Sequence, residues 1–201
     1  MSMRIVGGAA RGRLLRTAAG NALRPTGART REALFDILGD RISGARFLDL
    51  FAGSGAIGIE ALSRGAAAVT FVDNHTTAWR YISDNLARAE LGGGRLLKMD
   101  FRAAIEALSR KREQYDYVFI DPPYDSDLAA LTLRHMRFYP ILAPDGAVIV
   151  ETSRLRQFTH TPRPFHITAQ RRYGDTLLIF LQQMAIMPPV ASEPQPGGDL
   201  S

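Results

Sequence analysis

The stretch Asp-Leu-Phe-Ala-Gly-Ser-Gly-Ala-Ile-Gly, residues 49–58, decides the fold class of this 201-residue chain. Its glycines have the spacing G-x-G-x-x-G, at Gly53, Gly55 and Gly58. The apolar run 46–51 leading into the loop is typical of a strand, and the run 56–64 after it is typical of a helix. A glycine loop between a strand and a helix lets a ligand approach the backbone at the helix N-terminus. The stretch therefore predicts a ligand-binding α/β domain.

Strand and helix signals alternate around this loop. Strands are predicted over 46–51, 68–73, 95–99, 117–121 and 147–151, with helices over 30–39, 56–64, 76–91, 103–112 and 128–139. In the helix 76–91 we expect Trp79, Ile82 and Leu86 to face the core. Two last strands, 165–173 and 176–182, have only a Gly-Asp turn between them. This order predicts a doubly wound, mainly parallel α/β sheet with an antiparallel strand added late.

The N-terminal segment carries charge of one sign. Residues 1–31 contain seven arginines, and the first acidic residue is Glu32, after which the signs are nearly balanced. The part around Arg4–Leu15 predicts a small β-hairpin. A cationic segment beside a balanced domain indicates a phosphate-binding surface, although a solvated arm would look the same. We assign nucleic-acid contacts to Arg4, Arg11, Arg13, Arg24, Arg29 and Arg31.

Composition limits the remaining possibilities. The sequence has no cysteine, which excludes disulfides and thiolate metal sites, and its four histidines are not clustered. Its apolar runs are strand-sized, and no signal peptide is visible, so we expect a cytoplasmic monomer with neither membrane nor metal. We divide the chain into a basic hairpin or arm (1–27), a main domain (28–184) and a disordered, proline-rich tail (185–201).

Acidic residues follow three of the predicted strands. Asp49 stands four residues before Gly53, where a carboxylate repels a pyrophosphate but attracts a cation. This charge favours S-adenosylmethionine, which carries sulfonium and ammonium groups, over a dinucleotide. Asp73 is placed to accept hydrogen bonds from ribose hydroxyls, and Asp100 from an adenine amino group, with Phe101 beside the ring. The carboxyl ends of parallel strands form the ligand-binding edge of open α/β sheets, so these residues should meet there.

The motif Asp121-Pro122-Pro123-Tyr124 follows the strand 117–121. Two prolines cannot extend a central strand, so the chain must turn out of the sheet. The turn offers the Asp121 carboxylate and the Pro122 carbonyl as adjacent acceptors, with Tyr124 available to stack on a base. Two acceptors can hold the hydrogens of an exocyclic amine and direct its lone pair at a methyl group. The motif therefore predicts methylation of an unpaired nucleobase amine.

These motifs together resemble the RsmD family of 16S ribosomal RNA guanine-N2 methyltransferases over about residues 4–182. The likeness rests on the glycine loop, the Asp-Pro-Pro-Tyr motif, Glu60–Ala66, Arg4–Gly8, Arg11–Arg13, Arg24–Thr26 with Arg31, Glu32 and Phe35, and Tyr173–Thr176. The resemblance implies a seven-stranded class I methyltransferase fold, S-adenosylmethionine as donor, and an RNA target in the small subunit or its assembly intermediate. It also implies cofactor contacts at Phe51, Gly53, Gly55 and Asn74.

Three other functions remain open on the residues alone. The catalytic motif also suits adenine-N6 or protein-glutamine methylation, because each presents an sp2 nitrogen. An RNA-binding protein without catalysis would not need Asp49, Gly53, Gly55 and Asp121. An NAD-dependent oxidoreductase is opposed by Asp49 and would leave Asp-Pro-Pro-Tyr without a role.

Overall fold

The computed structural model describes residues 2–17, 27–123, 127–153 and 161–184. Its main sheet has the strand order β5-β4-β3-β6-β7-β9-β8. The strands are β3 (Arg46–Asp49), β4 (Ala68–Asp73), β5 (Gly94–Lys98), β6 (Tyr115–Ile120), β7 (Leu142–Ser153), β8 (Phe165–Tyr173) and β9 (Thr176–Gln183). The strands from β5 to β7 are parallel, and β9 lies antiparallel between β7 and β8. The expected doubly wound, seven-stranded sheet is therefore confirmed.

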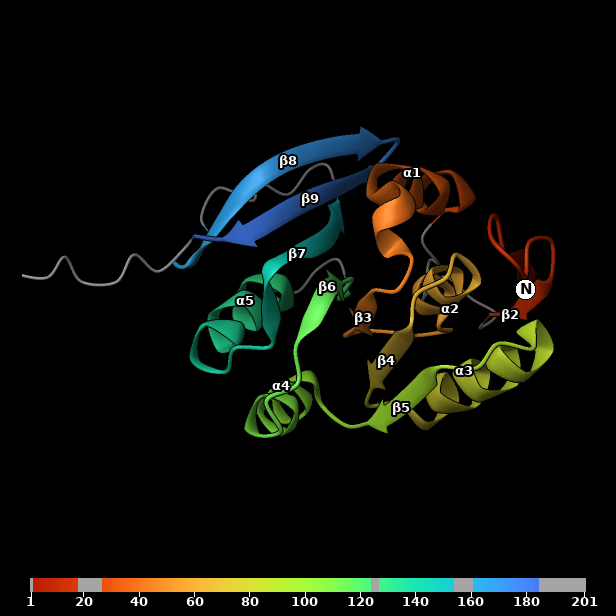
Figure 1. Ribbon diagram of the computed structural model, residues 1–201, viewed down its shortest axis with the longest axis horizontal. Coiled ribbons are helices and arrows are strands. Elements are labelled where there is room, and N and C mark those ends of the chain that lie inside the picture. Colours follow the sequence, from red (N-terminus) through yellow and green to blue (C-terminus); the bar gives the residue numbers. More distant parts are fainter. Residues whose placement is uncertain (1, 18–26, 124–126, 154–160, 185–201) are drawn as a thin grey trace, which may run out of the picture.

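Helices cover both faces of the sheet (Figure 1). One face carries α1 (Ala28–Leu38), η1 (Gly39–Ile42), α2 (Ala56–Ser63) and α3 (Thr76–Ala89), and the other carries α4 (Phe101–Arg110) and α5 (Leu128–Phe138). Alternate residues of β3 divide between the two faces, because Phe47 belongs to the first hydrophobic cluster and Leu48 to the second. None of these helices, within the described ranges, is long and apolar enough to cross a membrane.

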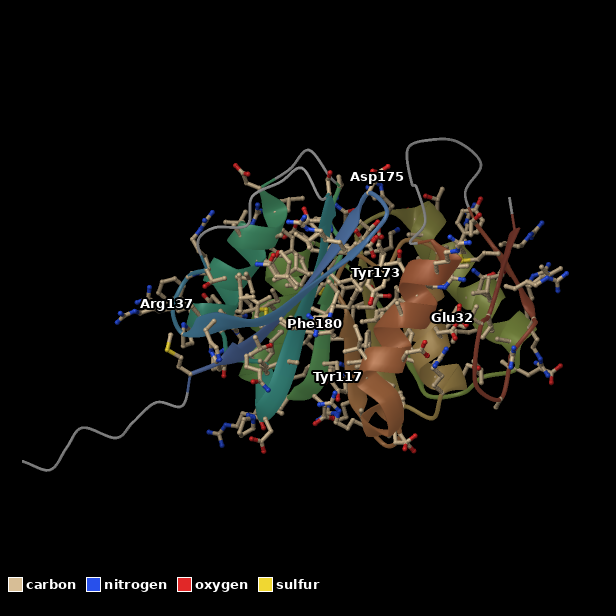
Figure 2. All side chains as sticks on the ribbon, turned by 90° about the horizontal axis from the view of Figure 1, so that it is seen from above. Glu32, Tyr117, Arg137, Tyr173, Asp175 and Phe180 are labelled. Carbon is tan, nitrogen blue, oxygen red and sulfur yellow. The ribbon has the colours of Figure 1, made fainter. Side chains whose placement is uncertain are left out.

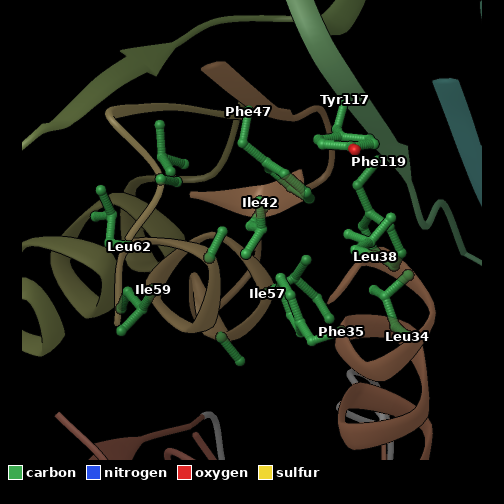
Figure 3. Close-up of a cluster of buried hydrophobic side chains, with 14 of the residues drawn as sticks. Leu34, Phe35, Leu38, Ile42, Phe47, Ile57, Ile59, Leu62, Tyr117 and Phe119 are labelled. Atoms are coloured by element: carbon green, nitrogen blue, oxygen red, sulfur yellow. The ribbon is translucent and has the colours of Figure 1, made fainter. Parts of the chain in front are cut away.

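The first cluster is aromatic where α1 meets the sheet (Figure 3). The ring of Phe35 stacks on that of Phe47 with centroids 6.4 Å apart, and Phe47 lies 6.3 Å from the ring of Tyr117. Ile57 and Ile59 of α2 join the same cluster. Leu34, Phe35 and Leu38 of α1 are all buried in this cluster.

The N-terminal hairpin is part of the same core. Its strands β1 (Ser2–Arg4) and β2 (Leu14–Arg16) pair antiparallel, which confirms the hairpin predicted from the sequence. Ile5, Ala10 and Leu15 are buried in the first cluster together with residues of α1 and α2. The hairpin is therefore packed into the main domain and does not form a separate body.

Polar groups of α2 hold the hairpin in place. The buried carboxylate of Glu60 accepts hydrogen bonds from the backbone N–H groups of Val6 (2.9 Å) and Gly7 (2.7 Å). The hydroxyl of Ser63 accepts one from Ala10 N–H at 2.9 Å and donates one to the Gly7 carbonyl at 2.6 Å. At Gly8 the backbones come so close that a Cβ atom would lie 1.8 Å from the Ser63 carbonyl oxygen. Only glycine fits there.

Two expectations about single elements are wrong. Trp79 does not face the core: it is 44% exposed, and the buried side of α3 consists of Ala78, Ile82, Asn85 and Ala89. Small and polar side chains occupy this side because α3 packs closely against β2 and the glycine loop. The strand predicted over 147–151 starts earlier, at Leu142, and its pairing with β6 shifts register between Tyr115 and Tyr117.

We predict that Gly58→Ala destabilises the protein. A Cβ atom at Gly58, in the buried helix α2, would lie 2.3 Å from a ring carbon of Phe71 and 2.8 Å from Val69 Cγ1. Moving these packed side chains should lower the free energy of unfolding by about 1–3 kcal/mol. The control is Gly92→Ala, where a Cβ atom would have no neighbour within 4 Å. It should change stability by less than about 0.5 kcal/mol in urea unfolding. Equal effects at the two positions would contradict the close packing of α2.

Candidate functional site

The candidate site lies at the carboxyl edge of the parallel strands, where β3 and β6 are neighbours at the centre of the sheet. The crossover from β3 to β4 runs through α2 on one face, and that from β5 to β6 runs through α4 on the other. Such a switch point opens a crevice for ligands beyond the strand ends. A backbone hydrogen bond from Leu50 N–H to the Phe119 carbonyl (3.0 Å) ties the start of the glycine loop to β6.

The glycine loop has the backbone conformation that its sequence requires. Gly53 and Gly55 have φ angles of 53° and 77°, in the left-handed region that glycine adopts without strain. Gly55 is the N-cap of α2 and donates its N–H to the Ala52 carbonyl at 2.7 Å. A Cβ atom at Gly53 would meet nothing within 4 Å, so the space beside the loop is open to a ligand.

Asp73, at the end of β4, fixes the loop from the neighbouring strand. Its Oδ2 accepts the Gly53 N–H at 2.9 Å, and its Oδ1 accepts the His75 N–H at 2.8 Å. Each carboxylate oxygen has a second lone pair, so Asp73 keeps the capacity to accept hydrogen bonds from ligand hydroxyls. The side chain is half-buried at the carboxyl edge, where the sequence placed it.

Asp49 lies beneath the loop and is only 2% exposed. Its carboxylate accepts the Gly58 N–H at 3.2 Å, which links the end of β3 to the first turn of α2. Burial raises the pKa of Asp49 to about 7, the Gly58 hydrogen bond opposes this, and repulsion from Asp73 and Glu151 adds to it. A buried carboxylate with such a pKa gains from any cation that enters the site.

Aromatic side chains line the edge beside the loop. The rings of Phe51 and Phe101 lie 5.3 Å apart with their planes tilted by 41°, so two residues from different strand ends come together as an apolar wall. Asp100 caps α4, because its Oδ1 accepts the Arg102 N–H at 2.9 Å. Its side chain is 45% exposed. Asn74 is exposed next to Asp73.

The Asp-Pro-Pro motif begins where β6 ends. Asp121 is half-buried and Pro122 is buried, directly after the last residue of the strand, Ile120. Neighbouring β3 ends at Asp49, so the motif and the glycine loop extend from adjacent strands. The structure therefore brings Asp121 and Pro122 to the same edge as Asp49, Asp73 and Phe51. Tyr124 lies outside the described residues.

The arginines assigned to nucleic acid differ in exposure. Arg4, Arg11 and Arg29 are exposed, whereas Arg13 is half-buried and forms an ion pair with Glu90 at 2.9 Å. Arg4 also donates to the Gly12 carbonyl at 2.9 Å, which stabilises the hairpin. Arg24 lies outside the described residues. These positions leave a cationic hairpin surface around Arg4 and Arg11.

The assignment of Arg31 to nucleic acid is wrong. This residue is only 2% exposed, and its Nη2 donates to the Arg4 carbonyl at 2.8 Å. Burial lowers the pKa of its guanidinium, while the carboxylates of Glu60 and Glu151 raise it. Arg31 is thus the interior counter-charge of two buried acids. The order of charged residues along the chain could not distinguish the buried Arg31 from the exposed arginines near it.

The sequence analysis missed Glu60, Ser63 and Asn85. All three are buried polar residues whose partners are backbone groups far away in the sequence. Glu60 and Ser63 carry the hairpin, and Asn85 contacts both the hairpin and the glycine loop through Ser54. Glu60 and Ser63 belong to the stretch Glu60–Ala66 that resembles the family, but the sequence does not show that they bind the hairpin, and Asn85 gives no such signal. No group of three or more metal-ligating side chains occurs in the described ranges.

Comparison with known proteins identifies close relatives. The chain matches the family described as Conserved hypothetical protein 95 over residues 3–182. A protein of Escherichia coli K12 named Ribosomal RNA small subunit methyltransferase D is 37% identical over 150 residues, covering 75% of this chain and 74% of that protein. A protein of the same name from Haemophilus influenzae is 34% identical over 174 residues, covering 86% and 89%.

A solved structure shares the fold at similar identity. It belongs to a hypothetical protein of Thermus thermophilus, is 30% identical and superimposes with a TM-score of 0.78. The match covers 90% of this chain and 99% of that one.

We predict that Asp49 lowers stability as pH rises. Its pKa is about 7 in the folded protein and about 4 in an unfolded chain, so the folded state favours the protonated form. Stability from this group is fully present below about pH 4 and is lost as pH rises to about 7. The difference of about three units corresponds to a loss of about 4 kcal/mol.

Urea unfolding of wild type and Asp49→Asn between pH 4 and pH 8 measures this loss. Asparagine can accept the Gly58 N–H but does not titrate, so the difference between the two proteins isolates Asp49. The free energy of unfolding of wild type should fall relative to that of the variant up to about pH 7 and then level off. Parallel curves over the whole range would show that Asp49 keeps an ordinary pKa.

Proposed function

The chain belongs to the family described as Conserved hypothetical protein 95, as its motifs predicted, and from that premise we propose that it methylates ribosomal RNA of the small subunit with S-adenosylmethionine. At the finer level, we propose the exocyclic N2 amine of a guanine as the acceptor. Support for ribosomal RNA comes from the names of relatives that share at least a third of their aligned residues with this chain. Support for an amine acceptor comes from the Asp-Pro-Pro motif.

One observation carries the proposal. The Asp-Pro-Pro motif and the glycine loop extend from the adjacent strands β6 and β3, which are tied together by the Leu50–Phe119 hydrogen bond of 3.0 Å. A donor held by the loop and an acceptor held by the motif would then meet at the same edge. A dinucleotide enzyme would need the loop but has no use for the motif.

The residues around the loop fit S-adenosylmethionine. Open space beside Gly53 admits the ligand, the ionised form of Asp49 favours its positive charge, and Asp73 has lone pairs for its ribose hydroxyls. Phe51 and Phe101 offer an apolar wall for its adenine, and Asp100 and Asn74 lie at the exposed side of that wall. When bound, the cofactor supplies an electrophilic methyl group on a sulfonium.

The Asp-Pro-Pro turn prepares the acceptor nitrogen. The lone pair of a nucleobase amine is delocalised into the ring and is a weak nucleophile. The Asp121 carboxylate and the Pro122 carbonyl accept the two N–H groups and favour a geometry in which the lone pair points at the methyl group. The same acceptors stabilise the positive charge that develops on the nitrogen during transfer. Tyr124 is proposed to stack on the base. After transfer, the methylated nitrogen passes one proton to the Asp121 carboxylate and from there to solvent.

The target nucleoside is best identified directly. The protein and labelled S-adenosylmethionine are incubated with small subunits, with free ribosomal RNA and with DNA in three separate reactions. The methylated nucleoside is then mapped in each. We expect N2-methylguanosine from ribosomal RNA or small subunits. N6-methyladenosine would support the same mechanism but overturn guanine as the target base. The absence of any labelled product would overturn the whole proposal.

We predict that Asp121→Ala abolishes most methyl transfer. The loss of one acceptor that acts in the transition state should lower the rate by about 10²–10³. Affinity for S-adenosylhomocysteine should stay within a few-fold, because Asp121 contacts the amine in this mechanism. The matched control is Asp145→Asn, an exposed acid near the start of β7, at the opposite edge of the sheet. Near-normal single-turnover rates in Asp121→Ala would refute the acceptor role.

We predict that the exposed hairpin and α1 arginines give RNA binding its salt dependence. Each arginine that contacts a phosphate displaces counterions, with a log–log slope of about −0.7 to −0.9 per contact. The double variant Arg11→Ala/Arg29→Ala should therefore flatten the slope for small-subunit binding by about 1.5.

A matched control removes two cations from elsewhere. Lys111 and Arg137 are exposed at the ends of α4 and α5, on the other face of the sheet. Figure 2 shows Arg137 on the side of the molecule away from the hairpin. Replacing both with alanine removes the same charge but should leave the slope unchanged. If the two double variants behave alike, net charge and not the N-terminal segment governs binding.

A further inference from the structure

Asn85 is the most completely buried polar side chain at the junction of hairpin and glycine loop. It lies in α3 with 0% exposure. Its Oδ1 accepts the Arg16 backbone N–H at 2.7 Å, and its Nδ2 donates to the Arg16 carbonyl at 2.8 Å and to the Ser54 carbonyl at 2.9 Å. Arg16 ends the hairpin strand β2, and Ser54 lies between the two positive-φ glycines of the loop. One side chain therefore contacts both segments.

The surroundings dictate an asparagine. Two carbonyl oxygens and one N–H group face the side chain, which calls for two donors and one acceptor on a short stem. The primary amide of asparagine provides this set, whereas a carboxylate lacks the donors and an aliphatic side chain lacks both. The same partners fix the amide orientation, because the reverse placement would set an NH2 group against the Arg16 N–H. The Asn85 side chain is itself fully buried, so leaving its amide without partners would be costly.

Two polar anchors of the hairpin come from different helices. Glu60 and Ser63 of α2 hold Val6, Gly7 and Ala10, near the hairpin turn. Asn85 holds the end of β2 and the loop together. Within the described residues, the Asn85 side chain is thus the polar link from the hairpin to Ser54.

We propose that Asn85 is a positioning residue that fixes the hairpin and the glycine loop in one arrangement, so that RNA on the hairpin and methyl donor on the loop are presented to each other. This role rests on the proposed function, in which the loop holds S-adenosylmethionine and the hairpin contacts RNA. Ordering the loop around a ligand restrains Ser54, Ser54 restrains the Asn85 amide, and the amide restrains Arg16.

Hydrogen exchange on the wild-type protein tests the link without a mutation. The Arg16 amide, which donates to Asn85, should exchange about tenfold more slowly when S-adenosylhomocysteine saturates the protein. The Ala10 amide, which donates to Ser63, is the internal control and should change by less than about twofold. If both amides slow equally, or if neither changes, Asn85 does not transmit the state of the loop and the proposal is overturned.

Two matched variants test the same link by binding. Asn85→Ala leaves the Ser54 carbonyl without this partner and should weaken S-adenosylhomocysteine binding about tenfold by calorimetry. Ser63→Ala removes a hairpin anchor on α2 and should leave cofactor affinity within about twofold. Both variants should weaken binding to small subunits, and at saturating cofactor and RNA only Asn85→Ala should have a reduced kcat.

The outcomes separate this inference from the function on which it rests. Failure of wild type to bind S-adenosylhomocysteine would overturn the proposed function. Binding by wild type together with unchanged affinity in folded Asn85→Ala would overturn only the role of Asn85. Should Asn85→Ala fail to fold, the exchange rates of the wild-type Arg16 and Ala10 amides decide the question alone.

Discussion

All eight residues of α2, Ala56–Ser63, are buried, and the helix has neighbours on every side. It packs on the sheet so closely at Gly58 that no side chain fits between the helix and Phe71. Its first turn begins at the glycine loop, and its last turns carry the hairpin through Glu60 and Ser63. The packing of this one short helix on the sheet therefore determines where the glycine loop and the hairpin lie.

Several charged side chains are buried in and around the candidate site. Glu60, Glu151 and Asp49 are buried acids, and the first two interact with a buried cation, Arg31. Arg31 offsets the first two acids, while Asp49 stays in an environment that raises its pKa. Removing one partner of a buried ion pair is strongly destabilising, so the buried acids Glu60 and Glu151 favour keeping Arg31 charged in the interior. A cationic ligand is the natural complement to Asp49.

The sequence predicted the elements well because apolar spacing is a local property. The alternation of strands and helices, the positive-φ glycines and the acids at strand ends all lie where residues 46–183 indicated. Arg31 and Trp79 were misjudged because their environment depends on segments distant in sequence. Arg31 meets the hairpin carbonyl of Arg4, and α3 turns Asn85 inward because β2 and the loop offer backbone partners. No local pattern encodes such contacts.

The two hairpin anchors also constrain how the protein is made. The hairpin is synthesised before the residues that hold it. Glu60 follows Val6 by 54 residues, and Asn85 follows Arg16 by 69 residues. Contacts of such long sequence separation form late, because the chain between them has to be closed into a loop first. Until α3 has been synthesised, Arg16 of strand β2 has no Asn85 side chain to bind. The hairpin is therefore fully held only after residues 49–89, which include both the glycine loop and α3, have been synthesised.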